Sequence, residues 1–317
     1  NVAPRIAYRK NASWDVFRNA VEANPTTPIM DPKDPSLYYN FKGQAAGYNP
    51  LELLKKDKST GTTKLLDWDG TVKLNLLPLL LNKEDRQTLT TQLTFADHQY
   101  DNYNQWFRPS TSTLAINAGR EGEASQDYSK SAIRTLEWVT NYANSFGNHN
   151  FKVMAGYSYQ YEQYSGLNAA NKDFPNDALE DNNLGSGTYA KDEGELGMGS
   201  YKNDSKLISF FGRVSYDWKG RYMLTASLRH EGSSKFGEHH KWGNFPAISA
   251  GWRISDEAFM AGTKSWLTDL KLRGDFGITG NQSFDSYRSL NTMSGFGYYL
   301  YNGKYYQVWG PGKPVTP

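Results

Sequence analysis

Apolar and polar residues alternate along several segments of about ten residues, which is the period of a β-strand with two unlike faces. The clearest segment is RYMLTASLRHEG, residues 221–232. Its apolar face carries Tyr222, Leu224, Ala226 and Leu228, and its polar face carries Arg221, Thr225, Ser227, Arg229 and Glu231. The preceding segment, residues 207–217, alternates in the same way. The four residues DWKG that join the two segments predict a tight hairpin turn.

Six further segments alternate with the same period. They cover residues 72–76, 89–95, 136–142, 151–160, 246–253 and 270–279. The apolar faces of all eight segments contain no Lys, Arg, Asp or Glu, whereas the opposite faces contain many. Arg or Lys on the lipid side of a membrane strand costs about 2–4 kcal/mol at mid-bilayer, but the same charge is hydrated in the lumen. The pattern therefore predicts an all-β fold, a transmembrane antiparallel β-barrel, in which Pro246 marks a strand start or a bulge.

The connections between these segments differ in length. SFGNHN (residues 145–150) and DWKG are short, whereas long polar connections run from about Gly166 to Lys206 and from Tyr100 to Ser131. Short turns on one rim and long loops on the other are typical of bacterial outer-membrane barrels, whose short turns are periplasmic. We therefore expect an aromatic girdle at the periplasmic rim. Its members would be Tyr142, Phe151, Tyr216, Tyr222 and Trp252.

Three regions follow along the chain. Residues 1–70 are predicted to be mostly an extracellular loop region with short helices, residues 71–282 the transmembrane strands with their loops, and residues 283–317 a second extracellular loop region. One helix is predicted in SWDVFRNAVEANP, with Ser13 as its N-cap and Pro25 at its end. A second is predicted in NPLELLKK, with Asn49 as the cap and Pro50 in the first turn.

Composition supports a surface with one wet and one apolar side. The mean hydropathy of the 317 residues is −0.72, yet aromatic residues make up 15% of them. No run reaches the roughly 18 apolar residues of a membrane helix. The net charge of +2 gives no reason to expect a nucleic-acid partner, and the absence of Cys excludes disulfides and thiolate chemistry. Because the chain begins without Met and ends in GPGKPVTP, we expect it to be part of a longer protein.

Motifs for catalysis, metals and cofactors are weak, so we expect none of the three. His239 and His240 are better explained as a loop tip than as a metal pair. Asp67-Trp68-Asp69-Gly70 lacks the further ligands of a calcium loop and is expected to form a turn before a strand at Thr71. The glycine-rich stretch Gly194–Gly199 lacks the strand and helix of a nucleotide site. No G-x-S-x-G motif occurs.

Aromatic clusters in the predicted loops are the remaining candidates for ligand binding, because aromatic rings can stack on sugars and peptides. Loop packing or a place in the girdle is the alternative explanation. The candidate substrate-binding residues are Tyr103, Trp106, Phe107, Tyr305 and Trp309.

Three longer stretches resemble the SusC/RagA family of TonB-linked outer-membrane proteins. They are LISFFGRVSYDWKGRYMLTASLRHEGSSKFG (207–237), WGNFPAISAGWRISDEAFM (242–260) and WLTDLKLRGDFGITGNQ (266–282). The segments NPTTPIMDP, YNPLELLK, FPNDALEDNNLGSG and YLYNGKYYQ also fit the family. The resemblance covers most of the chain. A TonB box, a plug domain and a closing C-terminal strand are not recognised, and no ligand residue can be carried over.

The resemblance implies a plugged barrel of about 22 strands, of which this chain would supply about eight. It implies import of glycans or oligopeptides across the bacterial outer membrane of Bacteroidetes, energised by the TonB complex, with a SusD-like surface lipoprotein as partner. A small closed barrel acting as an adhesin or structural porin is the alternative function. A third possibility is a soluble, glycan-binding β-sandwich, which requires a dry core behind the apolar faces.

Overall fold

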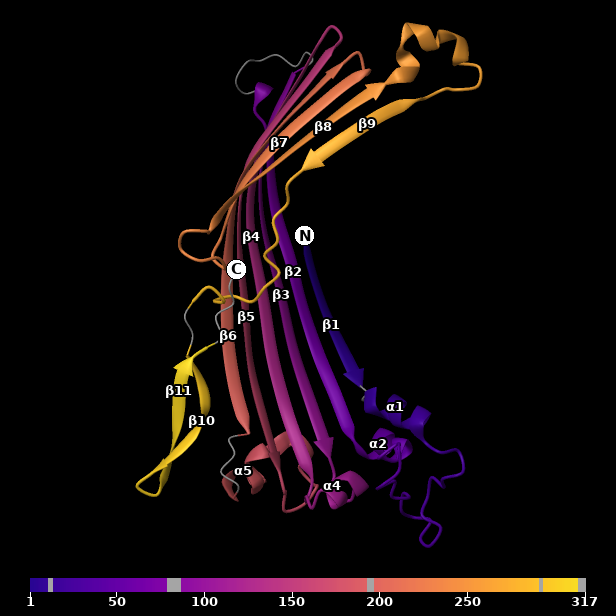
Figure 1. Ribbon diagram of the computed structural model, residues 1–317, viewed down its shortest axis with the longest axis vertical. Coiled ribbons are helices and arrows are strands. Elements are labelled where there is room, and N and C mark those ends of the chain that lie inside the picture. The colour runs from indigo at the N-terminus through magenta and orange to yellow at the C-terminus, as the bar shows by residue number, and fades with distance from the viewer. Residues whose placement is uncertain (11–13, 79–86, 193–196, 291–292, 313–317) are drawn as a thin grey trace.

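The computed structural model describes residues 1–10, 14–78, 87–192, 197–290 and 293–312. Nine strands form one antiparallel sheet in which each strand pairs with its neighbour in the sequence, and a separate hairpin follows (Figure 1). The sheet strands are β1 (Val2–Lys10), β2 (Lys58–Asn75), β3 (Gln87–Arg108), β4 (Glu123–Phe146), β5 (His149–Lys172), β6 (Met198–Trp218), β7 (Tyr222–Ser233), β8 (Trp242–Arg253) and β9 (Lys271–Gly277). The hairpin consists of β10 (Met293–Tyr301) and β11 (Lys304–Pro311).

Short helices lie in the connections. They are α1 (Trp14–Glu22), α2 (Pro50–Lys56), α4 (Thr113–Asn117), α5 (Tyr189–Asp192) and the 3₁₀ helices η1 (Glu180–Ser186), η2 (Ile254–Asp256) and η3 (Ala258–Thr263). The first two confirm the predicted helices, and the Asn49 side chain caps α2 by accepting from the amides of Leu51 and Glu52. The proposed cap Ser13 lies outside the described residues. None of the described helices is long and apolar enough to cross a membrane.

The register brings the eight predicted apolar faces onto one side of the sheet. Leu93 pairs with Trp138, Trp138 with Tyr157, Tyr157 with Phe210 and Phe210 with His230. Because side chains alternate between the two faces of a strand, a slip of one residue in any strand would have moved its apolar set to the opposite side. All eight predicted strands are therefore confirmed, as β2 to β9, in a mutually consistent register.

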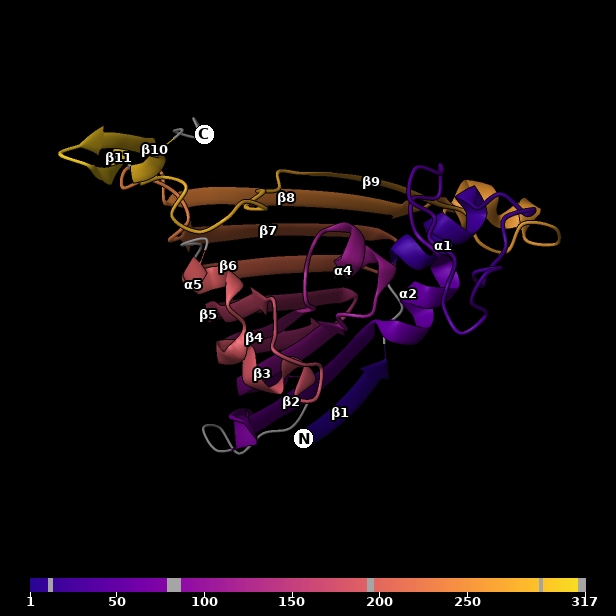
Figure 2. The same ribbon diagram turned by 90° about the horizontal axis from the view of Figure 1, so that it is seen from below.

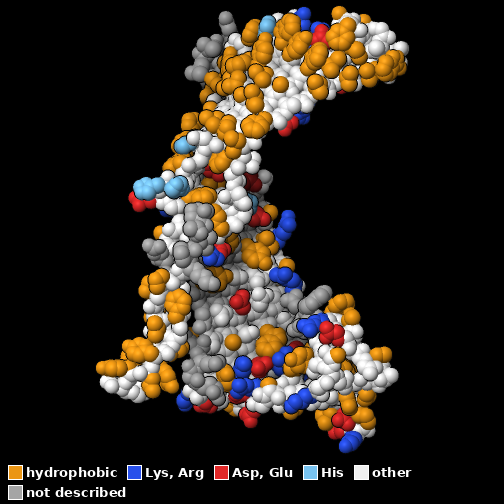
Figure 3. Space-filling model, in the orientation of Figure 1, with side chains coloured by type: hydrophobic (Ala, Val, Ile, Leu, Met, Phe, Trp, Pro, Cys, Tyr) orange, Lys and Arg blue, Asp and Glu red, His pale blue; other side chains and the backbone are white. Residues whose placement is uncertain are grey.

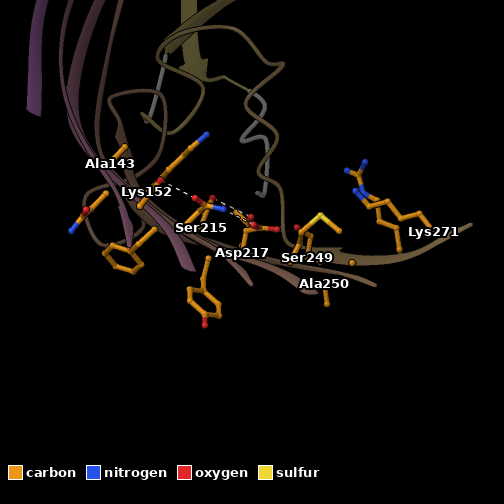
Figure 4. Close-up of a pocket in the computed structure, with 16 residues that line it drawn as sticks. Ala143, Lys152, Ser215, Asp217, Ser249, Ala250 and Lys271 are labelled. Atoms are coloured by element: carbon orange, nitrogen blue, oxygen red, sulfur yellow. Dashed lines mark hydrogen bonds between the residues drawn. The ribbon is translucent and has the colours of Figure 1, made fainter. Parts of the chain in front are cut away.

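The sheet is curved (Figure 2), and its two faces carry different side chains. The side that carries Leu93, Trp138 and Phe210 is called here the convex face, and the other side the concave face. In Figure 4, Lys152, Ser215, Asp217 and Ser249 lie on the concave side of the sheet and Ala250 on the opposite side. Across the described residues there is one large sheet with β1 and β9 at its edges. This arrangement is neither the closed eight-stranded barrel nor the sandwich that the sequence left open.

The strands extend well beyond the segments that alternate. β3 has 22 residues and β4 and β5 have 24 each. Most of Tyr100–Ser131 and part of Gly166–Lys206 are therefore strand, so the expectation of long loops there was wrong in extent. Polar residues occupy both faces of these extensions, so the alternation that revealed the rest of each strand is absent.

The structure also shows strands near the two ends of the chain. Residues 1–70 include β1 and most of β2, with the helical connection between them, and residues 283–317 include the β10–β11 hairpin. The expected turn at Asp67–Gly70 lies inside β2 and pairs with β1 and β3. Both neighbours supply backbone partners, which overrides the local turn propensity of Asp and Gly.

Connections sort to the two ends of the sheet. At one end, called the short-connection end, β4 and β5 are joined by residues 147–148 and β6 and β7 by residues 219–221. Lys219 and Gly220 have positive φ values of 56° and 65°, which allow this tight reversal. The long-connection end carries the described residues 14–57, 109–122, 173–192 and 234–241. Two connections at the short-connection end are longer. Eleven residues separate β2 from β3 in the sequence, and residues 254–270 form a connection with η2 and η3.

Candidate functional site

Large apolar side chains on the convex face remain exposed. Examples are Leu93, Trp138, Phe210, Leu224 and Ile248, each 47–53% exposed. Figure 3 shows hydrophobic side chains gathered over the upper arm of the molecule, where β7 to β9 lie, and charged side chains gathered over the lower part. A contiguous exposed apolar surface of this kind is typical of contact with another protein or with lipid.

The uncharged band on the convex face ends at a defined row of residues toward the long-connection end, and it reaches the short-connection end of the sheet. Toward the long-connection end, the last uncharged row across the strands is Phe95, Leu136, Tyr159 and Ile208. The next row is Asp97, Arg134, Tyr161 and Lys206. From Tyr159 to Phe151, which lies near the short-connection end of β5, the band covers about 27 Å at roughly 3.4 Å per residue. In tilted strands this length matches the apolar band of an outer-membrane barrel, which is about 25 Å tall.

Aromatic rings border the band at the short-connection end. The five predicted girdle residues lie there on the convex face. Tyr222 stacks on Trp218 and Trp252, with ring centroids 5.5 and 6.4 Å apart. Glu257, just beyond β8, accepts hydrogen bonds from the Tyr222 hydroxyl and from the Trp252 indole at 2.9 Å, and it pairs with Arg221 at 2.9 Å. These hydrogen bonds, led by that of Tyr222, hold the pKa of Glu257 below its usual value.

The concave face is polar. Near the short-connection end it forms an open hollow of about 560 Å³, lined from several strands by Lys152, Asp217, Lys271 and Arg273 among others (Figure 4). Asn150 donates to Asp217 at 2.8 Å and so orients that carboxylate. The sequence placed these residues on polar strand faces, but their convergence depends on the curvature of the sheet, which the sequence did not predict. Lys152, Lys271 and Arg273 give the hollow three cationic side chains that can hold anionic groups.

Loops at the long-connection end are fixed to the strands by a small core and buried charges. Phe107, Ala124 and Phe174 are buried together, with Leu184 packed against them. Asp181 in η1 accepts a hydrogen bond of 2.6 Å from Gln105. Further pairs join Arg108 to Asp57 at 2.7 Å and to Glu123 at 3.2 Å. The side chain of Asp57 is largely buried, and this burial raises its pKa in spite of Arg108. The β5–β6 connection is thus held on the convex face of the strands.

The five candidate binding residues do not converge on one site. Strand alternation places Trp106 on the concave face and Tyr103 on the convex face. Phe107 is only 3% exposed, so its ring packs within the loop core and is not open to a ligand. Tyr305 and Trp309 are exposed on β11, in the separate hairpin.

The other candidate sites remain isolated. His239 and His240 are exposed in the β7–β8 connection, as expected for a loop tip. No group of three or more metal-binding side chains occurs in the described ranges. Part of the stretch Gly194–Gly199 lies outside the described residues.

Comparison with known proteins gives consistent matches. Two TonB-dependent receptors of Formosa agariphila, P39 and P3, are 38% and 33% identical to this chain over 51% and 59% of its length. The TonB-dependent receptor SusC of Bacteroides thetaiotaomicron is 26% identical over 89% of the chain. The chain spans only 15–28% of the length of these three relatives. No family model matches the chain.

Solved structures share the fold. The structure of the RagAB peptide importer in its open-open state matches 99% of this chain. The match covers 34% of the RagAB chain, with a TM-score of 0.70 and 17% sequence identity. The importer's closed-closed state matches 83% of this chain with a TM-score of 0.66. The nine-stranded sheet described above therefore has the fold of part of these larger structures. The chain is thus similar over most of its length to part of the TonB-dependent receptor SusC, and it has the fold of part of the RagAB importer.

Proposed function

We propose that this chain forms part of the barrel wall of a TonB-dependent transporter that imports glycans or oligopeptides across the bacterial outer membrane. The observation that carries the proposal is the uncharged, exposed convex band on a sheet whose concave face is polar. Such a sheet separates lipid from a wet lumen. Import, rather than catalysis, is favoured because the similar proteins are named receptors and importers.

The orientation in the membrane follows from the connections. The short-connection end is periplasmic in this proposal, and the long-connection end, with residues 14–57, 109–122 and 173–192, is extracellular. The strands continue beyond the apolar band only at the long-connection end. On that side the barrel wall therefore rises above the membrane. A SusD-like lipoprotein would contact this raised rim, and the TonB complex would act through parts of the receptor outside this chain.

Ligand contact is assigned to aromatic side chains near the long-connection end. Trp106 is the strongest candidate, because it lies on the concave face with the Arg108 guanidinium 4.8 Å from its ring centre. Tyr103, Tyr305 and Trp309 are retained as secondary candidates, because their rings lie near this rim or remain exposed in the hairpin. Phe107 is not kept as a ligand residue, because its ring is buried in the loop core.

Extraction of the complete receptor from cells tests the membrane role. We expect release only by detergent and a heat-modifiable electrophoretic mobility, because the exposed apolar band requires lipid or detergent. Release of the folded protein by aqueous buffer alone would refute the proposal. Co-purification with a surface lipoprotein, followed by mass spectrometry of trapped small molecules, then tests import and distinguishes a glycan from a peptide cargo. A receptor that purifies without partner or cargo would favour an adhesin or porin.

A further inference from the structure

Basic side chains lie on the convex face immediately beyond the apolar band. Arg134 on β4 and Lys206 on β6 belong to the first row beyond the band, separated by Tyr161 of β5. Lys130 and Lys202 belong to a second row four residues further along, separated by Ser165. At the usual strand geometry, each row places its two cations about 10 Å apart, and the rows are about 13 Å apart.

The depth of these cations relative to the membrane follows from the number of residues that separate them from the last uncharged row. Arg134 is two residues from Leu136, and Lys206 is two residues from Ile208, so each lies one row, about 7 Å, beyond the last uncharged row. Trp242 lies in the last uncharged row, level with Ile208, and its ring stacks on those of Phe210 and His230 in the row just inside it, with His230 and Trp242 centroids 4.7 Å apart. Aromatic rings of this kind concentrate at the bilayer interface. The cations therefore lie at headgroup depth.

Neighbouring acidic groups neutralise only part of this surface. Asp97 lies 3.7 Å from Arg134, and Asp101 lies 3.8 Å from Lys130. Asp204, on the same face of β6, is hydrogen-bonded to the Tyr287 hydroxyl. Within the ranges that the structure describes, no carboxylate lies at ion-pair distance from Lys202 or Lys206, and both side chains are exposed. The face of β4 to β6 thus keeps an excess of positive charge.

We propose that the convex face of β4 to β6, just beyond the apolar band, binds the phosphate groups of an anionic lipid of the outer leaflet. Basic side chains at headgroup depth attract anionic lipid, and Arg in particular suits bidentate contact with phosphate. The continuity of the charged rows with the apolar band favours a lipid, whose acyl chains would cover the band while its phosphates meet the cations. This inference rests on the proposed membrane location of the chain.

Lipid retention by the complete receptor tests the site. The receptor is placed in phosphatidylcholine nanodiscs that contain either bisphosphorylated lipid A or the same lipid without its phosphates, and bound lipid is measured by native mass spectrometry. We expect a preference for the phosphorylated lipid. In the triple variant R134Q/K202Q/K206Q, retention should weaken roughly a hundredfold, because each cation near an anionic surface contributes about fivefold to binding. The matched variant K73Q/R213Q/R229Q removes three cations from the concave face and should retain the lipid as the wild type does.

Several outcomes would overturn the inference. These are equal retention of the two lipids, an equal loss in both triple variants, or displacement of the lipid A preference by inorganic phosphate alone, which would indicate a site for a free anion. Heat-modifiable mobility verifies that the variants fold, and the single variant K206Q provides a milder test if the triple variant does not. A receptor that needs detergent but shows no lipid preference contradicts this inference alone, whereas aqueous extraction contradicts the proposed function as well.

Discussion

The Trp252 indole donates a hydrogen bond of 2.9 Å to Glu257, a residue in the connection that follows β8. The same carboxylate accepts from Tyr222 and pairs with Arg221, so it ties β7, β8 and the connection together. Glu257→Gln keeps the size of the side chain but removes its charge. We expect the variant to unfold at a lower temperature at pH 7, as measured by the loss of the heat-modifiable form in detergent.

The lowered pKa of Glu257 also predicts a pH dependence. A carboxyl whose pKa is lower in the folded state than the unfolded value of about 4.3 stabilises the fold above that value. The stabilisation is lost as the pH falls through the folded pKa. The difference between wild type and Glu257→Gln should therefore be largest near neutral pH and should shrink below about pH 4. Asp256→Asn, at a more exposed neighbour, serves as the control, and a difference that grows in acid would contradict the assignment.

Two adjacent residues of β8 allow a direct test of the two faces. Ile248 lies on the convex face in the same row as Ala226, and Ser249 lies on the concave face opposite Asp275. Ile248→Arg should reduce the amount of folded receptor in the membrane, because Arg on the lipid side costs about 2–4 kcal/mol near mid-bilayer. Ser249→Arg should be tolerated. Quantitative immunoblotting of unheated membranes measures both, and equal yields would argue against a lipid-facing band.

The loop core predicts a local effect on the β5–β6 connection. Phe174 is 4% exposed and packs with Phe107 and Ala124, so Phe174→Ala should cost about 3–5 kcal/mol of local stability. We expect faster proteolytic cleavage within residues 173–192 while the barrel remains folded. Leu179→Ala, in the same connection but largely exposed, should leave the cleavage rate unchanged. Similar rates for the two variants would mean that the core does not hold the loop.

The alternation of apolar and polar residues predicted β2 to β9, because part of each of these strands has one apolar face and one polar face. The strand extensions were missed because Asp101, Lys130 and Lys202 give the convex face the same polar character as the concave face there. β1 was missed although Val2, Pro4, Ile6 and Tyr8 alternate with Ala3, Arg5, Ala7 and Arg9. Pro4 argues against a central strand, but it is tolerated because β1 lies at the edge of the described sheet.

The concave hollow was harder to predict than the band. The sequence assigned Lys152 and Lys271 to polar faces of separate strands, but it contains no signal that β5 and β9 curve toward a shared hollow. The convex band depends only on side-chain alternation, which is local. The hollow depends on the curvature accumulated over five strands, and curvature comes from twist and packing rather than from any short motif.

A close contact between neighbouring strands gives a test of the concave face. A Cβ atom at Gly156 would lie 2.5 Å from the Phe211 ring and 2.9 Å from the Trp138 carbonyl oxygen. Gly156→Ala should therefore displace Phe211 and destabilise the sheet by about 1–3 kcal/mol. Gly70→Ala, where the added atom meets nothing within 4 Å, should be neutral or slightly stabilising. Thermal unfolding in detergent measures both, and an unchanged Gly156→Ala would show that the ring moves without cost.

Trp106 provides the sharpest test of the ligand assignment. Its ring lies on the concave face at the long-connection end, where a cargo would enter the lumen, and Trp anchors commonly contribute more than 1 kcal/mol to binding. Trp106→Ala in the complete receptor should weaken binding about tenfold in calorimetric titration with a panel of oligopeptides and oligosaccharides. Tyr128→Ala, on the convex face of the neighbouring strand, removes a comparable exposed ring and should leave the affinity unchanged. If both variants bind as the wild type does, the cargo is held by residues outside this rim, and the aromatic rings of β3 serve the stability of the wall instead.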